Sequence, residues 1–447
     1  MPGHGQNLDQ YVSNFERFEK SLNGESKQPL HAVRKAALAR FTELGFPTTR
    51  DEEWRFTNVA PIAKQIFVPA LPSDGHRLGL KDIEPYLFKA DAPLRMVFVN
   101  GHWAPALSAV ESLPPGVRVM SLARAIVTEH DLVTQNLSKY VRFDGNAFAA
   151  LNMAFLKDGA FVMVPDGVEL SEAVHLLFLQ TGGSSPVMAT MRNVIVAGIA
   201  SRVSIVESYV GIGAPTSFTN AVTEFIVGDR AIVEHDKLQV ESTRSFHIGT
   251  THFHQGGGSG VVSNAIALGG RIARNDVTAV LNAEGCTCTL NGLSVATGDQ
   301  LIDNHTTIDH AKPGCESHEL YASILDGKSR GVFNGKILVR KDAQKTDAKQ
   351  TNRTLLLSDE ATIDTKPQLE IFADDVKCTH GATVGQLDED QVFYLRARGI
   401  DLVEARDVLT FAFARAVIDR IHVDPLREQL DAMLHTRLRQ GRVASEV

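Results

Sequence analysis

The chain has 447 residues, and at about 150 residues per domain this length predicts two to three structural units. Hydrophobic residues make up 43% of the chain and charged residues 22%, which excludes a disordered or a fibrous protein. The formal net charge of −8 disfavours nucleic acid and anionic membranes as partners, because both are bound through clustered Lys and Arg side chains.

The sequence shows no visible signal for export or membrane insertion. Residues 1–6 (MPGHGQ) have no basic stretch leading into an apolar run, so we expect no secretory signal. No segment approaches the roughly 18 uninterrupted apolar residues that a membrane helix needs. The four cysteines are too few for a disulfide framework in a chain of this length. We therefore predict a cytoplasmic protein that does not bind membranes.

Residues 1–160 are expected to form an N-terminal domain of helices with a few short strands. Val33, Ala37 and Phe41 recur at the spacing of one helix face, and Gly45 marks the end of that helix. Turn signals separate two short runs that we expect to be strands, residues 96–99 and 117–120.

The segment TRDEEWRFTNV, residues 49–59, places acidic residues in what resembles a first helical turn ahead of Trp54. A capped helix with a packed tryptophan explains this pattern. A recognition element explains it equally well, and the residues alone do not separate the two interpretations.

Residues 161–387 lack helical periodicity and consist of short Val-, Ile- and Thr-rich runs separated by Gly, Asp and Asn. Two runs, beginning at Arg202 and Arg230, look like copies of one another, which is typical of stacked repeats. We predict a β-solenoid rather than a large sandwich, because each short, polar-interrupted run would bury its apolar side only against its neighbours. The open ends of a solenoid must be capped or paired with a partner.

Residues 388–447 are expected to form a C-terminal helical domain. Asp388 and Asp401 are candidate N-caps, Gly399 is a candidate helix end, and Asp424 followed by Pro425 begins a further helix. This region could dock a partner, or it could be a lid on the end of the solenoid, and the sequence favours neither.

The segment ASILDGKS, which begins at Ala322, fits a loose phosphate-loop pattern. Ala322 replaces the leading glycine, and a turn and strand follow where a helix should begin. We therefore interpret Gly327 and Lys328 as part of a solenoid corner.

His252 and His254 lie two residues apart and would share one face of a strand, as in cupin-type metal enzymes. With His247 they define an alternative function, a cupin-like metal-dependent enzyme, although histidines buried in a β core are commoner. A carbohydrate-active β-helix enzyme is a further alternative, disfavoured because it would need export and paired carboxylates.

Cys286 and Cys288 also share a strand face, and together with Cys315, His305, His310 and His318 they could suggest zinc. Structural zinc sites usually place two or more residues between paired cysteines, so small buried thiols are the preferred interpretation.

Cys378 and His380 form the sharpest local feature of the chain. They would project to the same side of an extended segment at the end of the β region, with Lys377 nearby. This setting is expected to lower the pKa of the thiol and to offer soft and borderline ligands to iron. A structural corner is an equally good interpretation from spacing alone.

Several long stretches, in the same order along the chain, resemble those of a known protein family. They are EWRFTN from Glu53, residues 151–159, DNH from Asp303, residues 317–336, residues 366–385 with Cys378 and His380, and residues 393–400. These stretches are similar to the SufB/SufD family of the SUF iron–sulfur cluster assembly system. Where the SufB branch has an acidic residue before Ala-Thr, this chain reads His380-Gly-Ala-Thr, so the chain resembles the SufD branch.

The resemblance implies a right-handed parallel β-helix flanked by helical N- and C-terminal domains. It implies a non-catalytic scaffold that pairs with a SufB-like subunit, docks a SufC-like ABC ATPase through its C-terminal helices, and can form a homodimer in isolation. A transient, nascent iron–sulfur cluster would form at the SufB–SufD junction, with His380 and Cys378 as transient iron ligands. Some family complexes bind a reduced flavin. Whether Cys286, Cys288 or Cys315 take part is left open.

Overall fold

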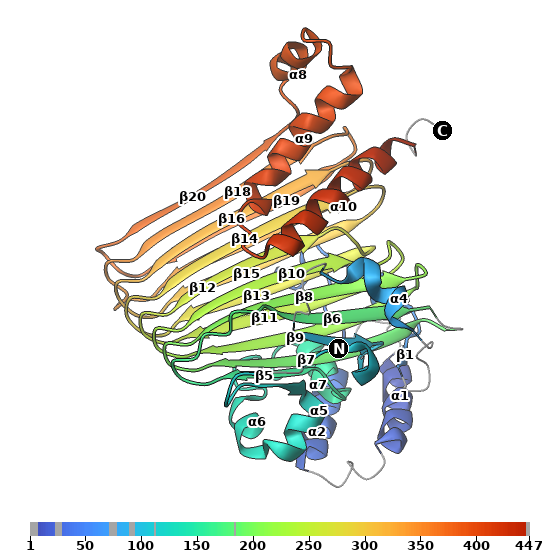
Figure 1. Cartoon of the computed structure of the whole chain (residues 1–447), viewed down its shortest axis with the longest axis vertical. Helices are drawn as coiled ribbons and strands as arrows, with labels where there is room; N and C mark the ends of the chain where they lie inside the picture. Colours follow the sequence, from blue (N-terminus) through green and yellow to red (C-terminus); the bar gives the residue numbers. More distant parts are fainter. Residues whose placement is uncertain are drawn as a thin grey trace.

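The computed structural model describes residues 8–22, 29–70, 78–88, 94–110, 113–182 and 185–443. Two ten-stranded sheets stack into a parallel β-solenoid of about 7 turns over residues 161–385, which confirms the predicted β-helix (Figure 1). The strands are β1 (Val68–Pro69), β2 (Arg95–Val99), β3 (His102–Trp103), β4 (Arg118–Ser121), β5 (Ala160–Val164), β6 (Val174–Thr181), β7 (Val187–Ala197), β8 (Arg202–Ile212), β9 (Ser217–Val227), β10 (Ile232–Val240), β11 (Phe246–Gln255), β12 (Gly260–Ala267), β13 (Ile272–Leu281), β14 (Thr287–Ala296), β15 (Leu301–His310), β16 (Glu316–Leu325), β17 (Arg330–Val339), β18 (Asp347–Leu356), β19 (Thr362–Ile371) and β20 (Lys377–Gly385).

From β5 onward the odd-numbered strands form one sheet and the even-numbered strands the other. Each strand pairs in parallel with the strands two before and two after it, so one turn of the solenoid contributes one strand to each sheet. The N-terminal strands β2 and β4 extend the same two sheets through β6 and β5. The expected domain boundaries at residues 160 and 387 stay a prediction.

The repeat proposed from Arg202 and Arg230 is real, but its alignment was wrong by two residues. Arg202 pairs with Ile232, so the turns are 30 residues apart at this point rather than 28. Arg230 instead corresponds to Ala200, and both lie in the turn before their strand with positive φ angles of 57° and 54°. The mismatch arose because turn residues were aligned with strand residues.

Every second residue of each strand points into the solenoid, and these side chains fill its interior. The buried residues comprise a large apolar cluster and many polar side chains. Space for large residues comes from glycines on a neighbouring strand. A Cβ on Gly292 would lie 2.2 Å from the Tyr321 ring, so only glycine fits beside this tyrosine.

Most of the N-terminal helices pack on the outer face of the odd-numbered sheet around a shared apolar core, whereas α4 packs through Ile83 against strands β2, β6 and β8 of the even-numbered sheet. Helix α2 confirms the expected helix, but Val33 is 36% exposed. The buried face contains Arg34 instead, whose Nε donates a hydrogen bond to the Leu156 carbonyl at 2.8 Å. The helices of this region are α1 (Leu8–Ser21), α2 (Pro29–Leu44), α3 (Ala60–Lys64), α4 (Leu80–Ile83), α5 (Leu122–Thr128), α6 (His130–Asn136) and α7 (Ala147–Ala154).

The segment 49–59 forms a single 3₁₀ turn, η2 (Glu52–Trp54), rather than a full helix. The Trp54 ring packs against Phe148, with ring centroids 5.1 Å apart, and against the guanidinium of Arg274. These contacts favour the packed-tryptophan interpretation over a recognition role.

Three C-terminal helices follow β20: α8 (Glu389–Arg396), α9 (Leu402–Ile418) and α10 (Asp424–Val443). Asp388 and Asp401 cap α8 and α9 by accepting hydrogen bonds from Asp390 N and Glu404 N, as predicted. Helices α9 and α10 lie on the outer face of the even-numbered sheet, while α8 projects beyond it (Figure 1). The lid interpretation is wrong, because β19 and β20 contain no buried residue.

Within the described ranges, none of the helices combines the length and the apolar character needed to cross a lipid bilayer.

Candidate functional site

Cys378 and His380 lie on β20, the last strand of the even-numbered sheet. They are two residues apart and therefore face the same side of the strand. Their register partners on β18 are Ala348 and Gln350, which are both buried in the interior of the solenoid. In earlier turns a residue at the position of His380 is covered by the next turn. β20 is the last strand of its sheet, so this position is open at the end of the solenoid and His380 is exposed.

Cys378 is half-buried and packs against an apolar cluster that includes Ile337, Val339 and Ala373. Burial raises the pKa of the Cys378 thiol, and the carboxylate of Asp347 adds to this effect. The expectation of a lowered pKa was therefore wrong. Lys377, the cation expected to lower it, is exposed and adjacent in sequence, so it faces the other side of the strand.

Two polar residues lie behind His380 in the stack of inward-facing positions. Gln350 is its neighbour on β18, and Glu319 on β16 is the neighbour of Gln350. Gln350 Nε2 donates a hydrogen bond to Glu319 Oε2 at 2.7 Å. Gly335 makes room for this amide, because a Cβ there would lie 2.4 Å from Gln350 Nε2.

Glu319 is fully enclosed, and burial raises its pKa to about 7, although the bond from Gln350 acts in the opposite direction. A carboxyl group that changes charge near neutral pH thus lies two turns below the exposed imidazole. No short motif in the sequence marks Glu319 or Gln350 as part of a site. Their spacing of 30 to 31 residues from one turn to the next is the signal that could have found them.

The pair Cys378 and His380 offers one soft and one borderline donor, a combination that suits iron. Within the described part of the chain, no group of three or more His, Cys, Asp or Glu residues is placed to hold a metal ion. A metal ion held by this pair would need its remaining ligands from outside the described residues.

The three histidines of the cupin-like alternative do not converge. His247 faces the interior, where its Nδ1 lies 2.8 Å from Glu241 Oε2. His252 and His254 face outward and stack on the ring of Tyr140, with centroids 5.3 and 4.1 Å away. The structure therefore gives this alternative no support.

The remaining cysteines are buried thiols, as their spacing predicts. Cys286 and Cys315 lie at one corner in neighbouring turns, and both donate to the carbonyl of Ala283 at 3.2 Å. Cys288 points into the apolar core. The segment at Gly327 is likewise the turn between β16 and β17, which confirms the solenoid-corner interpretation.

The fold and the site define a class of protein: a parallel β-solenoid whose open end presents an imidazole and a thiol. Two family models match the chain, the SufBD protein N-terminal region over residues 5–176 and the SUF system FeS cluster assembly SufBD core domain over residues 178–413. The chain belongs to the SufBD family of the SUF iron–sulfur cluster assembly system.

Individual relatives agree with this assignment. An iron–sulfur cluster assembly SufBD family protein of Synechocystis is 36% identical over 418 residues, covering 92% of this chain and 91% of the relative. The iron–sulfur cluster assembly protein SufD of Escherichia coli is 29% identical, with 99% of each chain covered. The chloroplastic protein ABCI7 of Arabidopsis thaliana is 29% identical, covering 93% of this chain and 88% of the relative.

Proposed function

We propose that the last turn of the solenoid forms one half of an iron–sulfur cluster assembly site, with His380 and Cys378 as iron ligands. The observation that carries this proposal is the exposure of His380 on the edge strand β20, beside a single thiol. Iron and sulfide are the cargo of such a site and leave with the finished cluster. Two ligands on this subunit suffice if a partner provides the others.

The partner at this end is, in our proposal, a SufB-like subunit. Strands β19 and β20 are the last of their sheets and present backbone groups that another strand can pair with. Ile371, Phe372 and Val384 add exposed apolar surface at the same end. The same edge would pair with a second copy of this chain in isolation. Binding of a reduced flavin stays a prediction.

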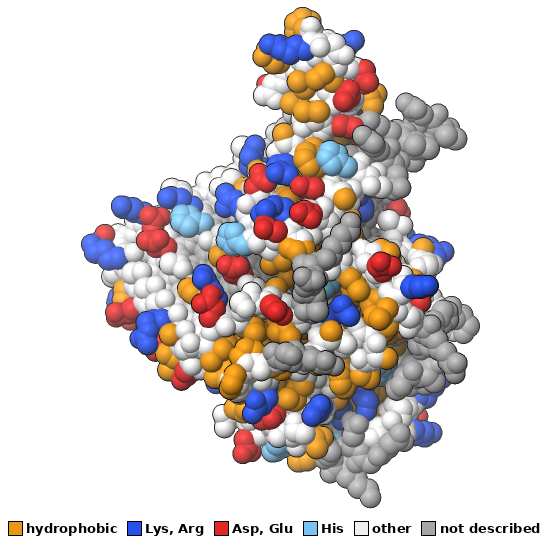
Figure 2. Space-filling model, viewed as in Figure 1, with side chains coloured by type: hydrophobic (Ala, Val, Ile, Leu, Met, Phe, Trp, Pro, Cys, Tyr) orange, Lys and Arg blue, Asp and Glu red, His pale blue; other side chains and the backbone are white. Residues whose placement is uncertain are grey.

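The second partner is a SufC-like ABC ATPase docked on an apolar surface of α8 and α9. We call this surface the α8–α9 patch; it consists of Phe393, Tyr394, Leu402, Val403 and Val408. Figure 2 shows hydrophobic side chains on the projecting helical tip, and Phe393 is 73% exposed. In this arrangement the chain is a non-catalytic scaffold, and ATP hydrolysis belongs to the partner. The free thiols suit the reducing cytoplasm, where we place the complex.

The cluster site is tested by His380→Ala in the complex purified with both partners. The variant should assemble normally but contain roughly tenfold less cluster, because one iron ligand is lost. His318→Ala is the matched control, since His318 is exposed on the same sheet but lies outside the site. Iron and sulfide content, together with the activity of cluster-dependent enzymes in cells, are the measurements. Normal cluster content in His380→Ala would overturn the proposal.

ATPase docking is tested separately by Phe393→Asp. This change should remove the ATPase from the purified complex while the SufB-like subunit remains, because a charge in a desolvated apolar contact is costly. Val127→Asp is the control, since Val127 is 69% exposed in the N-terminal region. Retention of the ATPase by Phe393→Asp would contradict docking at this patch.

A further inference from the structure

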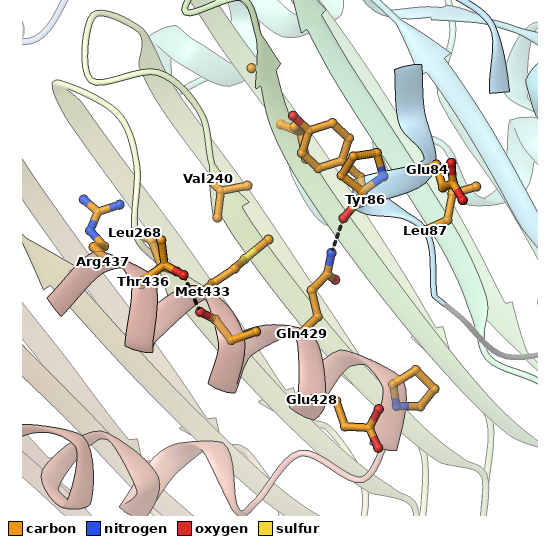
Figure 3. A pocket seen from close by; sticks show the side chains of 15 residues that line it. Glu84, Tyr86, Leu87, Val240, Leu268, Glu428, Gln429, Met433, Thr436 and Arg437 are labelled. Carbon is orange, nitrogen blue, oxygen red and sulfur yellow. Dashed lines mark hydrogen bonds between the residues drawn. The ribbon is translucent and has the colours of Figure 1, made fainter. Parts of the chain in front are cut away.

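A cavity of about 580 Å³ lies between helix α10 and the C-terminal ends of strands β8 and β10 of the even-numbered sheet, and an inference about it does not rest on the function proposed above. Its walls come from the 3₁₀ turn η4 (Glu84–Tyr86), from strands β8 and β10, from Leu268 and from α10 (Figure 3). This volume is in the range of sites that bind small organic molecules.

The middle of the cavity is apolar. Its walls there are formed by Tyr86, Leu87, Val240, Leu268 and Met433. Gln429 Nε2 donates a hydrogen bond to the Pro85 carbonyl at 3.0 Å, which ties α10 to η4 across the opening (Figure 3). This hydrogen bond links the two walls of the cavity.

Arg437 lies at one end of the cavity, opposite Glu84 and Glu428 (Figure 3). Its Nη2 donates to Gln300 Oε1 at 2.9 Å, but its buried Nε has no hydrogen-bond partner. Burial lowers the pKa of Arg437 to about 10, so the guanidinium is still charged at neutral pH. No carboxylate in the described part of the chain pairs with it.

We propose that this cavity binds an amphipathic monoanion, with its acidic head group against Arg437 and its apolar body along Leu268 and Met433. A guanidinium that is largely withdrawn from water and has no counter-ion is unfavourable, and an anionic head group in the cavity would supply the counter-ion. Glu84 and Glu428 are exposed at the far end, where water screens them and where they would disfavour a second anionic group.

The test compares dodecanoate with dodecanol, which have the same chain length and differ in the charge of the head group. The full-length protein should bind one dodecanoate by calorimetry, and Arg437→Gln should weaken that binding by about tenfold or more. Dodecanol binding should be the same in both proteins. Arg427→Gln is the matched control, because Arg427 lies on the same helix, pairs with Asp424 and does not line the cavity.

A second variant keeps the proposal testable if Arg437→Gln does not fold. Ala432 is exposed and lines the cavity, so Ala432→Trp should fill it and abolish the binding of both ligands without removing the buried charge. Dodecanoate binding that survives Ala432→Trp, or equal binding to wild type and Arg437→Gln, would overturn the proposal. A wild-type protein that binds no dodecanoate would overturn it as well.

Discussion

The guanidinium of Arg274 stacks on the indole ring of Trp54, with its central carbon 3.7 Å from the ring centroid. Arg274 belongs to β13 of the solenoid, and Trp54 belongs to the N-terminal turn η2, so the contact joins distant parts of the sequence. Arg274 also donates to Asp303 at 3.1 Å, and Thr57 donates to the same carboxylate at 2.5 Å. We infer that this cluster anchors the N-terminal region to the outer face of the solenoid.

Trp54→Ala should weaken this anchor. The substitution removes a half-buried ring together with a desolvated cation–π contact, and we expect a loss of about 2 to 3 kcal/mol in the free energy of unfolding. Urea denaturation measures the loss, and limited proteolysis should show earlier cleavage near residue 54. Arg55→Ala is the neighbouring control, because Arg55 is exposed. Equal stability of the two variants would contradict the anchoring role.

His305 makes the same anchor dependent on pH. Burial alone would lower its pKa, but the buried carboxylate of Asp303 and a contact from Glu53 raise that pKa from 6.5 to about 9. The stabilisation is fully present below pH 6.5 and is lost as the pH rises through 9.

His305→Gln should therefore lower the free energy of unfolding by about 3 kcal/mol near pH 6, a value that follows from the shift in pKa. The difference from wild type should shrink above pH 7 and vanish near pH 10. Urea denaturation across this pH range checks the expectation. A difference that stays constant with pH would show that His305 acts through packing alone.

The solenoid and the helices at both ends could be predicted from sequence because their signals are local. Strand propensity, turn residues and the N-caps Asp388 and Asp401 each act within a few positions. The surroundings of His380 could not be predicted in this way. Which residues stack beneath it depends on the length of every intervening turn, and the two-residue error at Arg230 shows how easily that register is lost.

Gly292 tests the close packing of the interior. Gly292→Ala would place a Cβ 2.2 Å from the buried Tyr321 ring, and the rigid neighbouring strands give little room for relief. We expect a loss of about 3 kcal/mol in the free energy of unfolding, measured in urea. Adding Tyr321→Leu should recover part of it. Gly381→Ala is the control, because a Cβ on this edge-strand residue meets nothing within 4 Å.

Glu319 provides the last prediction, since its charge is unfavourable in the interior beneath His380. Its pKa is raised from 4.5 to about 7, so the folded state holds the proton more tightly than the unfolded state. The wild type therefore loses stability as the pH rises from 4.5 through 7. Glu319→Gln keeps the shape and the contact with Gln350 while removing the titration, so the variant should gain about 3 kcal/mol relative to wild type between pH 5 and pH 8. Glu316→Gln, an exposed change on the same strand, should leave the pH profile unchanged. Parallel unfolding profiles for wild type and Glu319→Gln across this range would mean that Glu319 is already ionised in the folded protein, and that the interior below His380 tolerates a charge.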